Sequence, residues 1–258
     1  MKKPVIGLAL GAGAAKGFAH IGVLKALEEN DIFVDIVSGC SSGALIGGLY
    51  CSGLTPYELE DLATKVEYKD WIDITIPKMG VIKGKKIEKM IKKLTNNKNL
   101  EELDTRFISV ATNLNNSKRY IFETGPVHQA VRASISIPGI FEPVNIGDMS
   151  LVDGAVLDRI PVSVLRDLNP DIIIGVNIGF TDLNQEKVNI FDIIIQSVEL
   201  LTDQAMRAKK LDAEILIEPD LKTIGLTRFD LAKESIEIGY DATLAIMEDI
   251  KRQIALRS

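Results

Sequence analysis

The pentapeptide Gly39-Cys40-Ser41-Ser42-Gly43 constrains the fold more than any other part of the chain. The residues at 32–37 before it are mostly apolar and β-branched, which predicts a short buried strand, and the apolar run at 44–50 after it predicts a buried helix. A Gly-x-Ser-x-Gly sequence between a strand and a helix predicts a nucleophile elbow, a tight turn that lifts the serine hydroxyl above the end of the sheet. Gly39 and Gly43 permit the sharp turn, and the helix directs the positive end of its dipole at Ser41. On this motif alone, a turn that only packs the helix against the strand is an equal alternative.

A second glycine-rich turn lies near the start of the chain. The sequence predicts a buried strand at 5–10, a helix at 18–29, and between them the loop Gly11-Ala12-Gly13-Ala14-Ala15-Lys16-Gly17. A strand, a glycine loop and a helix N-terminus together form a general anion-binding cradle. The loop also resembles a dinucleotide-binding turn, but Gly17 comes one position later than the G-x-G-x-x-G pattern requires. A loop that only packs is the third interpretation.

The rest of the chain alternates strands with helices, which predicts an α/β sandwich around a mostly parallel sheet. Its length of 258 residues favours a single domain, 1–258. Further strands are expected at 107–112, 119–122, 151–152, 172–177 and 214–217, further helices from 55, at 85–94, 127–134, 190–211 and 231–256, and breaks or irregular segments at 80–84 and 137–143. Thr55, Pro56 and Glu58 predict a capping box at the start of their helix.

The segment around 55–100 is polar and rich in lysine, and we interpret it as a helical insertion into this domain. Within it, the helix at 85–94 has one apolar side and one basic side, the latter made of Lys85, Lys86, Lys89, Lys92 and Lys93. A solvated helix face is the simpler explanation of this basic side. The alternative is contact with anionic lipid headgroups, where each lysine near the surface contributes roughly 1 kcal/mol.

Charge and residue counts argue against several classes of function. The chain carries 30 basic and 36 acidic residues, so it lacks the basic excess of a nucleic-acid binder. Two histidines and two cysteines are too few for a zinc cluster, and Cys40 and Cys51 fit small buried thiols better than a disulfide framework. The first apolar run is short, is interrupted by Gly7 and leads into the glycine loop, which argues against a secretion signal. Because no apolar run reaches about 18 residues, we expect a cytoplasmic protein, peripheral to a membrane at most.

A serine hydroxyl is a poor nucleophile unless a base lies within hydrogen-bond reach. The α/β-hydrolase order of Ser, then Asp or Glu, then His is not met, because no histidine follows Asp153. His20 directly follows the glycine loop and is expected to pack there, whereas His128 lies in a polar helix and is expected to be exposed, and the sequence does not exclude it as the base. The other candidate is a carboxylate that acts directly on Ser41, and Asp153, at the sharp turn made with Gly154, is the best placed of many acids. Since an aspartate has a reference pKa of about 3.9, a direct pair needs surroundings that match the two groups.

Three separated blocks together resemble the patatin-like phospholipase family, including its bacterial members and the neuropathy-target-esterase branch. The blocks are the loop 11–17 with the following Phe18-Ala19-His20-Ile21-Gly22-Val23-Leu24, the elbow Gly39-Cys40-Ser41-Ser42-Gly43-Ala44, and Asp153-Gly154-Ala155. The stretch at 133–138 resembles a fourth family block. The order and spacing of the blocks make this resemblance more specific than any single motif.

The resemblance implies a three-layer α/β/α sandwich and a catalytic dyad in which Ser41 attacks an ester carbonyl and Asp153 is the base. The glycine loop would supply backbone N–H donors to the oxyanion with the positive charge of Lys16 nearby, and the loop residues concerned are Gly11, Gly13, Ala14 and Gly17. The implied substrates are lipid acyl esters, namely phospholipids or lysophospholipids, with no cofactor and no metal. Ala12 and Ala14 depart from the glycine-richest loops of the family, and the oxyanion hole stays undistorted only if both residues avoid positive φ.

Two other functions compete with a lipid acyl hydrolase. A nucleotide-binding α/β protein would use the loop at 11–17 and would bind NAD(P) or ATP saturably. A catalytically silent lipid-binding protein would keep the fold and would contact membranes through the helix at 85–94 without cleaving an ester.

Overall fold

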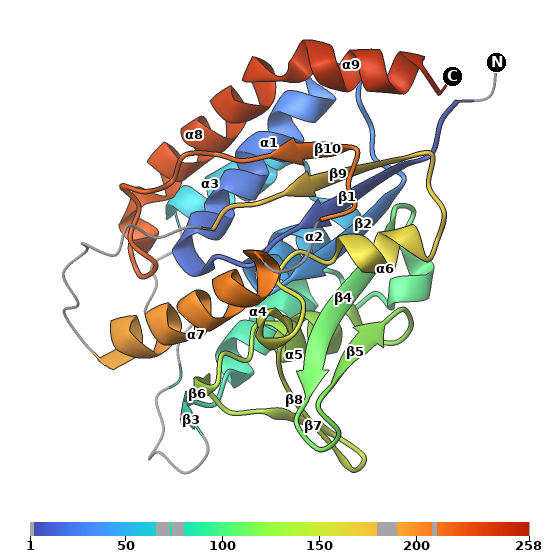
Figure 1. Ribbon diagram of the computed structural model, residues 1–258. Helices are drawn as coiled ribbons and strands as arrows, with labels where there is room; N and C mark the ends of the chain where they lie inside the picture. Colours follow the sequence, from blue (N-terminus) through green and yellow to red (C-terminus); the bar gives the residue numbers. More distant parts are fainter. Residues whose placement is uncertain (1–2, 66–72, 74–79, 180–189, 208–210, 258) are drawn as a thin grey trace.

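The computed structural model describes residues 3–65, 73, 80–179, 190–207 and 211–257. Its main sheet has eight strands, seven of them in the order β10-β9-β1-β2-β4-β8-β7, with β5 paired to the side of β4 (Figure 1). The parallel strands are β1 (Ile6–Leu10), β2 (Ile36–Cys40), β4 (Arg106–Asn113), β9 (Ile172–Val176) and β10 (Ile215–Ile217), and the antiparallel ones are β5 (Lys118–Phe122), β7 (Val144–Ile146) and β8 (Met149–Asp153). The sheet is therefore mostly parallel, as the sequence predicts.

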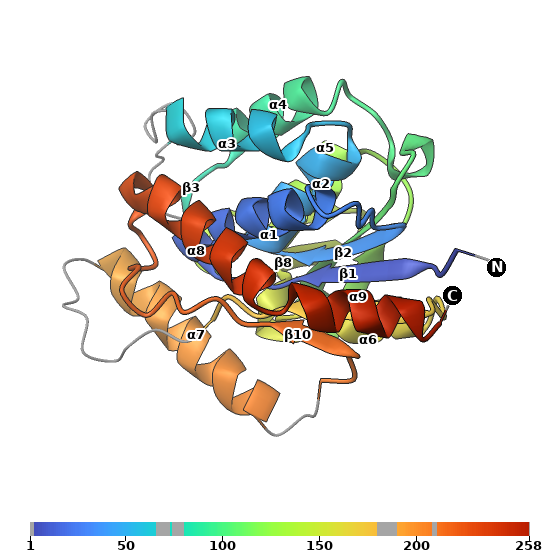
Figure 2. The same ribbon diagram turned by 90° about the horizontal axis from the view of Figure 1, so that it is seen from above.

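Helices cover both faces of this sheet and make three layers, which confirms the α/β/α sandwich (Figure 2). The helices α1 (Ala19–Glu28), α2 (Ser42–Cys51), α3 (Pro56–Lys65), α4 (Lys85–Leu94) and α5 (Val127–Ser134) lie on one side, whereas α6 (Val162–Arg166) and α7 (Ile190–Arg207) lie on the other. The helix α8 (Ala232–Ala245) packs along α1, and α9 (Met247–Ala255) follows it.

The core explains why the central strands are apolar throughout. Leu8 of β1 belongs to the main hydrophobic cluster together with Leu24 of α1, whereas Ala9, the next residue, belongs to a second cluster with Leu165 of α6. Successive side chains of a strand point to opposite faces of the sheet, so β1 is buried by a helix layer on each side.

The strand register places three chemically distinct segments at one end of the sheet. β1 and β2 pair in parallel with Leu10 opposite Gly39, so the glycine loop after β1 and the elbow after β2 begin side by side. β4 pairs with both β2 and β8, with Cys40 opposite Val110 and Ala111 opposite Asp153. The turn at Ser41 and the end of β8 therefore meet across β4.

Several predicted boundaries need correction. The strand expected at 32–37 is β2, and it runs instead through Ser38, Gly39 and Cys40, because pairing with a strand on each side outweighs the weak strand propensity of serine and glycine. The break expected at 80–84 contains β3 (Gly80–Ile82), which pairs in parallel with β6 (Gly139–Phe141) of the segment expected to be irregular. This pairing joins segments about sixty residues apart and leaves no local signal in either.

The two C-terminal helices also differ from their predictions. The helix expected at 231–256 is interrupted at Ile246. There the amide of Ile246 donates to Thr243 O, three residues earlier, in place of the usual four, and Thr243 Oγ1 donates to Gly239 O. The helix expected at 190–211 is described as far as Arg207, and its predicted continuation over 208–210 lies outside the described residues.

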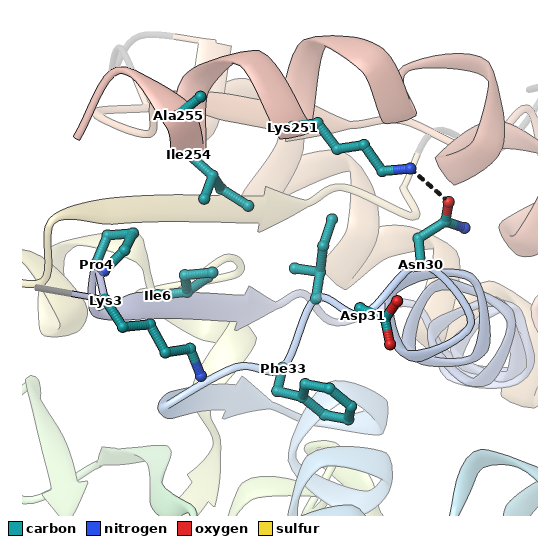
Figure 3. A pocket seen from close by; sticks show the side chains of 10 residues that line it. Lys3, Pro4, Ile6, Asn30, Asp31, Phe33, Lys251, Ile254 and Ala255 are labelled. Carbon is teal, nitrogen blue, oxygen red and sulfur yellow. Dashed lines mark hydrogen bonds between the residues drawn. The ribbon is translucent and has the colours of Figure 1, made fainter. Parts of the chain in front are cut away.

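A cavity of about 330 Å³ opens beside the start of β1, between that strand and α9 (Figure 3). Ile6 and Ile254 form part of its apolar lining, and Lys251 donates to Asn30 Oδ1 at 2.9 Å on one side of it. The cavity lies at the amino end of β1, whereas the elbow follows the carboxyl end of β2. It is therefore separate from the site described next.

Candidate active site

Ser41 occupies the turn between β2 and α2 that the elbow motif predicts. Its backbone has φ 54° and ψ −120°, a conformation that strains a non-glycine residue by about 1–3 kcal/mol. The amide of Ser41 donates to Ser134 Oγ at 2.9 Å, and the Ser134 hydroxyl donates to Val110 O at 2.6 Å, so α5 and β4 hold the turn. A Cβ atom on Gly43 would lie 2.2 Å from Leu10 O, so this position of the motif accepts only glycine.

The hydroxyl of Ser41 donates directly to Asp153 Oδ2 over an oxygen–oxygen distance of 2.6 Å. Asp153 ends β8, and its second oxygen, Oδ1, accepts from the amide of Ala155 at 2.9 Å. Its own amide donates to Ser136 O at 2.9 Å, which fixes the end of the strand. A distance of about 2.6–3.2 Å is what a nucleophile and its base require. Because the contact is direct, no imidazole stands between the two side chains.

Burial raises the pKa of Asp153 from its usual 3.8 to about 7. The hydrogen bonds from Ser41 and Ala155 act in the opposite direction, and Glu199 and Arg159 add smaller effects of opposite sign. A carboxyl group with a pKa near 7 is a far better base at neutral pH than an exposed aspartate. Burial thus makes Asp153 basic enough to accept a proton directly from a serine hydroxyl.

Neither histidine takes part in this pair. His20 is buried, and its Nε2 lies 2.8 Å from Gly11 O, so Nε2–H donates to the start of the glycine loop. Burial lowers the pKa of His20 to about 4, which leaves the ring neutral. His128 lies with Nδ1 3.2 Å from Glu88 Oε1 of α4 and is only partly accessible, so the expectation that it is exposed was wrong. The packing of α4 against α5 covers it.

Most backbone N–H groups of the glycine loop donate to carbonyl groups within the fold. The amides of Gly11, Ala12 and Ala15 donate to Val176 O, Arg159 O and Leu226 O at 3.0–3.2 Å. Among the described residues, the amides of Gly13 and Ala14 donate to no backbone carbonyl. These two N–H groups, and not that of Gly11, are thus available to an oxyanion.

The far end of the loop lies against the elbow. A Cβ atom on Gly17 would lie 2.3 Å from Ser42 Cβ, so the loop reaches the residue that follows the proposed nucleophile. Ala12 avoids positive φ, but Ala14 adopts φ 48°, so the condition for an undistorted loop fails at Ala14. The loop accommodates this strain while leaving the amide of Ala14 without a backbone acceptor among the described residues. Lys16 is buried, and burial lowers its pKa to about 8 while Glu199 opposes this change.

Comparison with known proteins adds independent information. The family model described as patatin-like phospholipase matches residues 8–166, which is more than half of the chain and includes the glycine loop, the elbow and Asp153. The chain belongs to the patatin-like phospholipase family.

Relatives of this patatin-like chain include a lysophospholipase of Emericella nidulans, 29% identical over 97% of the chain and 18% of the relative. An NTE family protein of Mycobacterium bovis is 33% identical over 68% of the chain and 49% of the relative. A lysophospholipase of Debaryomyces hansenii is 32% identical over 69% of the chain and 12% of the relative. The chain therefore spans less than half the length of each of these proteins.

Two solved structures share the patatin fold seen here. VipD from Legionella pneumophila aligns with a TM-score of 0.61 and 14% identity over 96% of this chain and 67% of its own. ExoU from Pseudomonas aeruginosa, solved in complex with SpcU, aligns with a TM-score of 0.53 and 14% identity over 98% of this chain and 53% of its own. At such low identity these likenesses concern the fold alone.

The residue that joins the glycine loop to α7 was not predicted from the sequence. Arg159 is buried, and its Nη2 donates to Ala12 O at 3.2 Å and pairs with Glu199 Oε2 at 2.6 Å. Its Nη1 lies 3.3 Å from Thr202 Oγ1. A single arginine carries no local signal of such a role, since its partners lie 147 residues before it and about forty after it.

Arg132 is a second buried arginine that the sequence analysis missed. It donates to Lys83 O at 2.7 Å and to Glu142 O at 2.9 Å, and so joins the ends of β3 and β6. It also donates to Ser136 Oγ at 2.5 Å, and Ser136 O in turn holds the amide of Asp153. The stretch 133–138 had been noted only for its resemblance to a family block.

Two further properties concern the described residues as a whole. No helix among them is both long and apolar enough to cross a membrane. The same residues contain no group of three or more histidine, cysteine, aspartate or glutamate side chains placed to hold a metal ion. Cys40 and Cys51 are buried free thiols, as predicted.

Proposed function

We propose that this chain hydrolyses carboxylic esters of lipids, with Ser41 as the nucleophile and Asp153 as its base. The observation that carries the proposal is the direct hydrogen bond of 2.6 Å between a serine in a strained elbow and a buried carboxylate. Membership of the patatin-like phospholipase family and the lysophospholipases among the relatives support lipids as the substrate class. Phospholipids and lysophospholipids both fit this class.

The first half of the reaction forms an acyl-enzyme. Ser41 Oγ attacks the ester carbonyl carbon while its proton moves to Asp153, and the carbonyl π electrons move to the oxygen. We place this oxyanion on the amides of Gly13 and Ala14, with the charge of Lys16 nearby, and the loss of one such donor typically costs about 10²–10³ in rate. Collapse breaks the bond to the alcohol, which leaves with the proton from Asp153.

The second half of the reaction hydrolyses the acyl-enzyme, with Asp153 again as the base. A water molecule gives a proton to Asp153 as its oxygen attacks the acyl carbon, and the same amides hold the second oxyanion. Collapse releases the carboxylic acid, and the proton on Asp153 returns to Ser41 Oγ. Each step uses one base that is neutral after accepting a proton, which suits the buried, apolar setting of Asp153.

Active-site labelling and turnover test this proposal. A fluorophosphonate probe should label the wild type at Ser41, and Ser41→Ala and Asp153→Asn should each abolish hydrolysis of p-nitrophenyl esters and lysophospholipids. Ser235→Ala is the matched control, because Ser235 is a buried serine of α8, outside the site. Turnover retained by either site variant would remove the dyad, and saturable NAD(P) or ATP binding without any hydrolysis would favour the nucleotide alternative.

We also propose peripheral contact between α4 and anionic headgroups. α4 buries Ile87 and Ile91 and leaves its five lysines exposed, as the sequence predicts. Lys89→Glu combined with Lys92→Glu should weaken cosedimentation with phosphatidylglycerol vesicles at low salt, because each lysine near such a surface contributes roughly 1 kcal/mol. Unchanged cosedimentation would contradict this contact.

A further inference from the structure

The outward face of α7 is apolar and uncharged. Its exposed described residues are spaced so that, at about 100° per residue, they share one arc of the helix about 100° wide. These residues are Ile190, Ile193, Ser197, Leu200, Leu201 and Gln204. Four of the six are large aliphatic side chains, and Leu201 is 70% exposed.

The inward side of the same helix carries its acids. Asp192 accepts from Thr227 Oγ1 at 2.8 Å, and Glu199 pairs with the buried Arg159 at 2.6 Å. A helix on the surface of a water-soluble protein normally buries its apolar stripe and exposes its charges. α7 buries Ile195 in a hydrophobic cluster, but it also turns its acids inward and a second apolar stripe outward, so this outward face calls for an apolar neighbour.

The helix that carries this face borders the turn at the proposed site. α7 packs against the short 3₁₀ helix η4 (Gly154–Val156), which begins at the residue after Asp153. Val156 and the next residue, Leu157, are exposed large apolar side chains. We call the outward face of α7 the α7 surface. It belongs to the helix that packs beside the turn holding the proposed base, where Val156 and Leu157 add exposed apolar side chains. Apolar surfaces of this kind mark sites of contact with a protein, a ligand or a membrane.

We propose that the α7 surface docks the protein on the uncharged part of a lipid aggregate, with the proposed site facing the lipid. This inference rests on the proposed function, because a site that takes acyl chains has to be brought to an interface where they are found. The charge of α7 indicates which kind of lipid surface it contacts. Its outward face is neutral and its inward side carries acids, so it would not attract anionic headgroups. α4, with its lysines, lies in the opposite outer layer (Figure 2), so the two surfaces are distinct.

A flotation assay with phosphatidylcholine vesicles at low and high salt tests the docking. The test variant is Ile193→Ser combined with Leu201→Ser, and the matched control is Leu256→Ser, because Leu256 is 72% exposed but follows α9, away from the site. Wild type and control should float with the vesicles at both salt concentrations, since the contact is apolar. The double variant should bind about tenfold or more weakly, the effect of withholding two aliphatic side chains from lipid.

Hydrolysis of a soluble short-chain ester by the same samples separates this inference from the proposed function. The double variant should keep wild-type hydrolysis of that ester, which also shows that it is folded, and should lose activity only on vesicles. Wild-type protein that fails to float, or a double variant that floats unchanged, would overturn the docking while leaving ester hydrolysis intact. A wild-type dimer that the double variant dissociates, without a change in flotation, would assign the α7 surface to a second copy of the chain and would also overturn it.

Discussion

The buried carboxyl group of Asp153 should make the stability of the fold depend on pH in a way that one substitution removes. Its pKa is about 7 in the folded chain and 3.8 in its usual state, so folding binds a proton between these two pH values. The contribution of Asp153 to the free energy of unfolding is therefore largest below pH 3.8. It falls as the pH rises and is lost above pH 7. The difference in pKa corresponds to roughly 4 kcal/mol.

Asp153→Asn isolates this contribution. Urea unfolding of wild type and variant between pH 4 and pH 8 should show that the variant gains up to roughly 4 kcal/mol relative to wild type across this range, because all other acids cancel in the difference. The side-chain amide that this substitution places beside the N–H of Ala155 adds a cost that does not depend on pH. This cost shifts the stability difference between variant and wild type equally at every pH, so the slope of that difference against pH is unchanged. Wild-type hydrolysis should rise with pH as Asp153 ionises near pH 7. A stability difference that is flat from pH 4 to pH 8 would refute the reasoning.

Two further substitutions, each with a matched control, test the loop and its attachment. Ala14→Gly should raise the free energy of unfolding by up to about 1 kcal/mol in urea, since relief of positive φ outweighs the added chain entropy, whereas Ala12→Gly, where φ is not positive, should lower it. Arg159→Met should cost about 3–5 kcal/mol because it removes the ion pair of Glu199, whose side chain is only 13% exposed. Arg106→Met, at an exposed pair, should cost under about 1 kcal/mol. Equal costs at the two arginines would contradict this assignment of burial.

Local patterns explain which parts of the fold could be predicted. The helices at 85–94 and 127–134 occur with the predicted bounds, because an apolar side repeated every three or four residues is a local property of the chain. The capping box also forms, with the amide of Thr55 donating to Glu58 Oε2 at 2.8 Å. The glycine loop and the elbow were recognisable because a tight turn restricts residue type over a few consecutive positions.

Features that depend on distant partners could not be predicted in the same way. The pairing of β3 with β6 and the clamp of Arg159 each join segments far apart in the chain, and neither leaves a periodic pattern. The choice of Asp153 from 36 acidic residues needed the family resemblance, because a sequence does not show which carboxyl group a sheet will bury. The structure places it against Ser41, and its role as the base stays a prediction for the substitutions above.

The end of the sheet that carries the candidate site combines strained backbone with a buried carboxyl group. Ser41 and Ala14 are held at positive φ, and Asp153 is buried with no cation from the described residues in direct contact. These features share a cause, because a serine that pairs directly with a carboxylate needs a strained turn to present its hydroxyl and a carboxyl group whose pKa is raised by burial. Substitutions that relieve the strain or the burial should therefore stabilise the chain and, at Ser41 and Asp153, abolish hydrolysis. Stability and activity are thus expected to oppose each other at the ends of β1, β2 and β8.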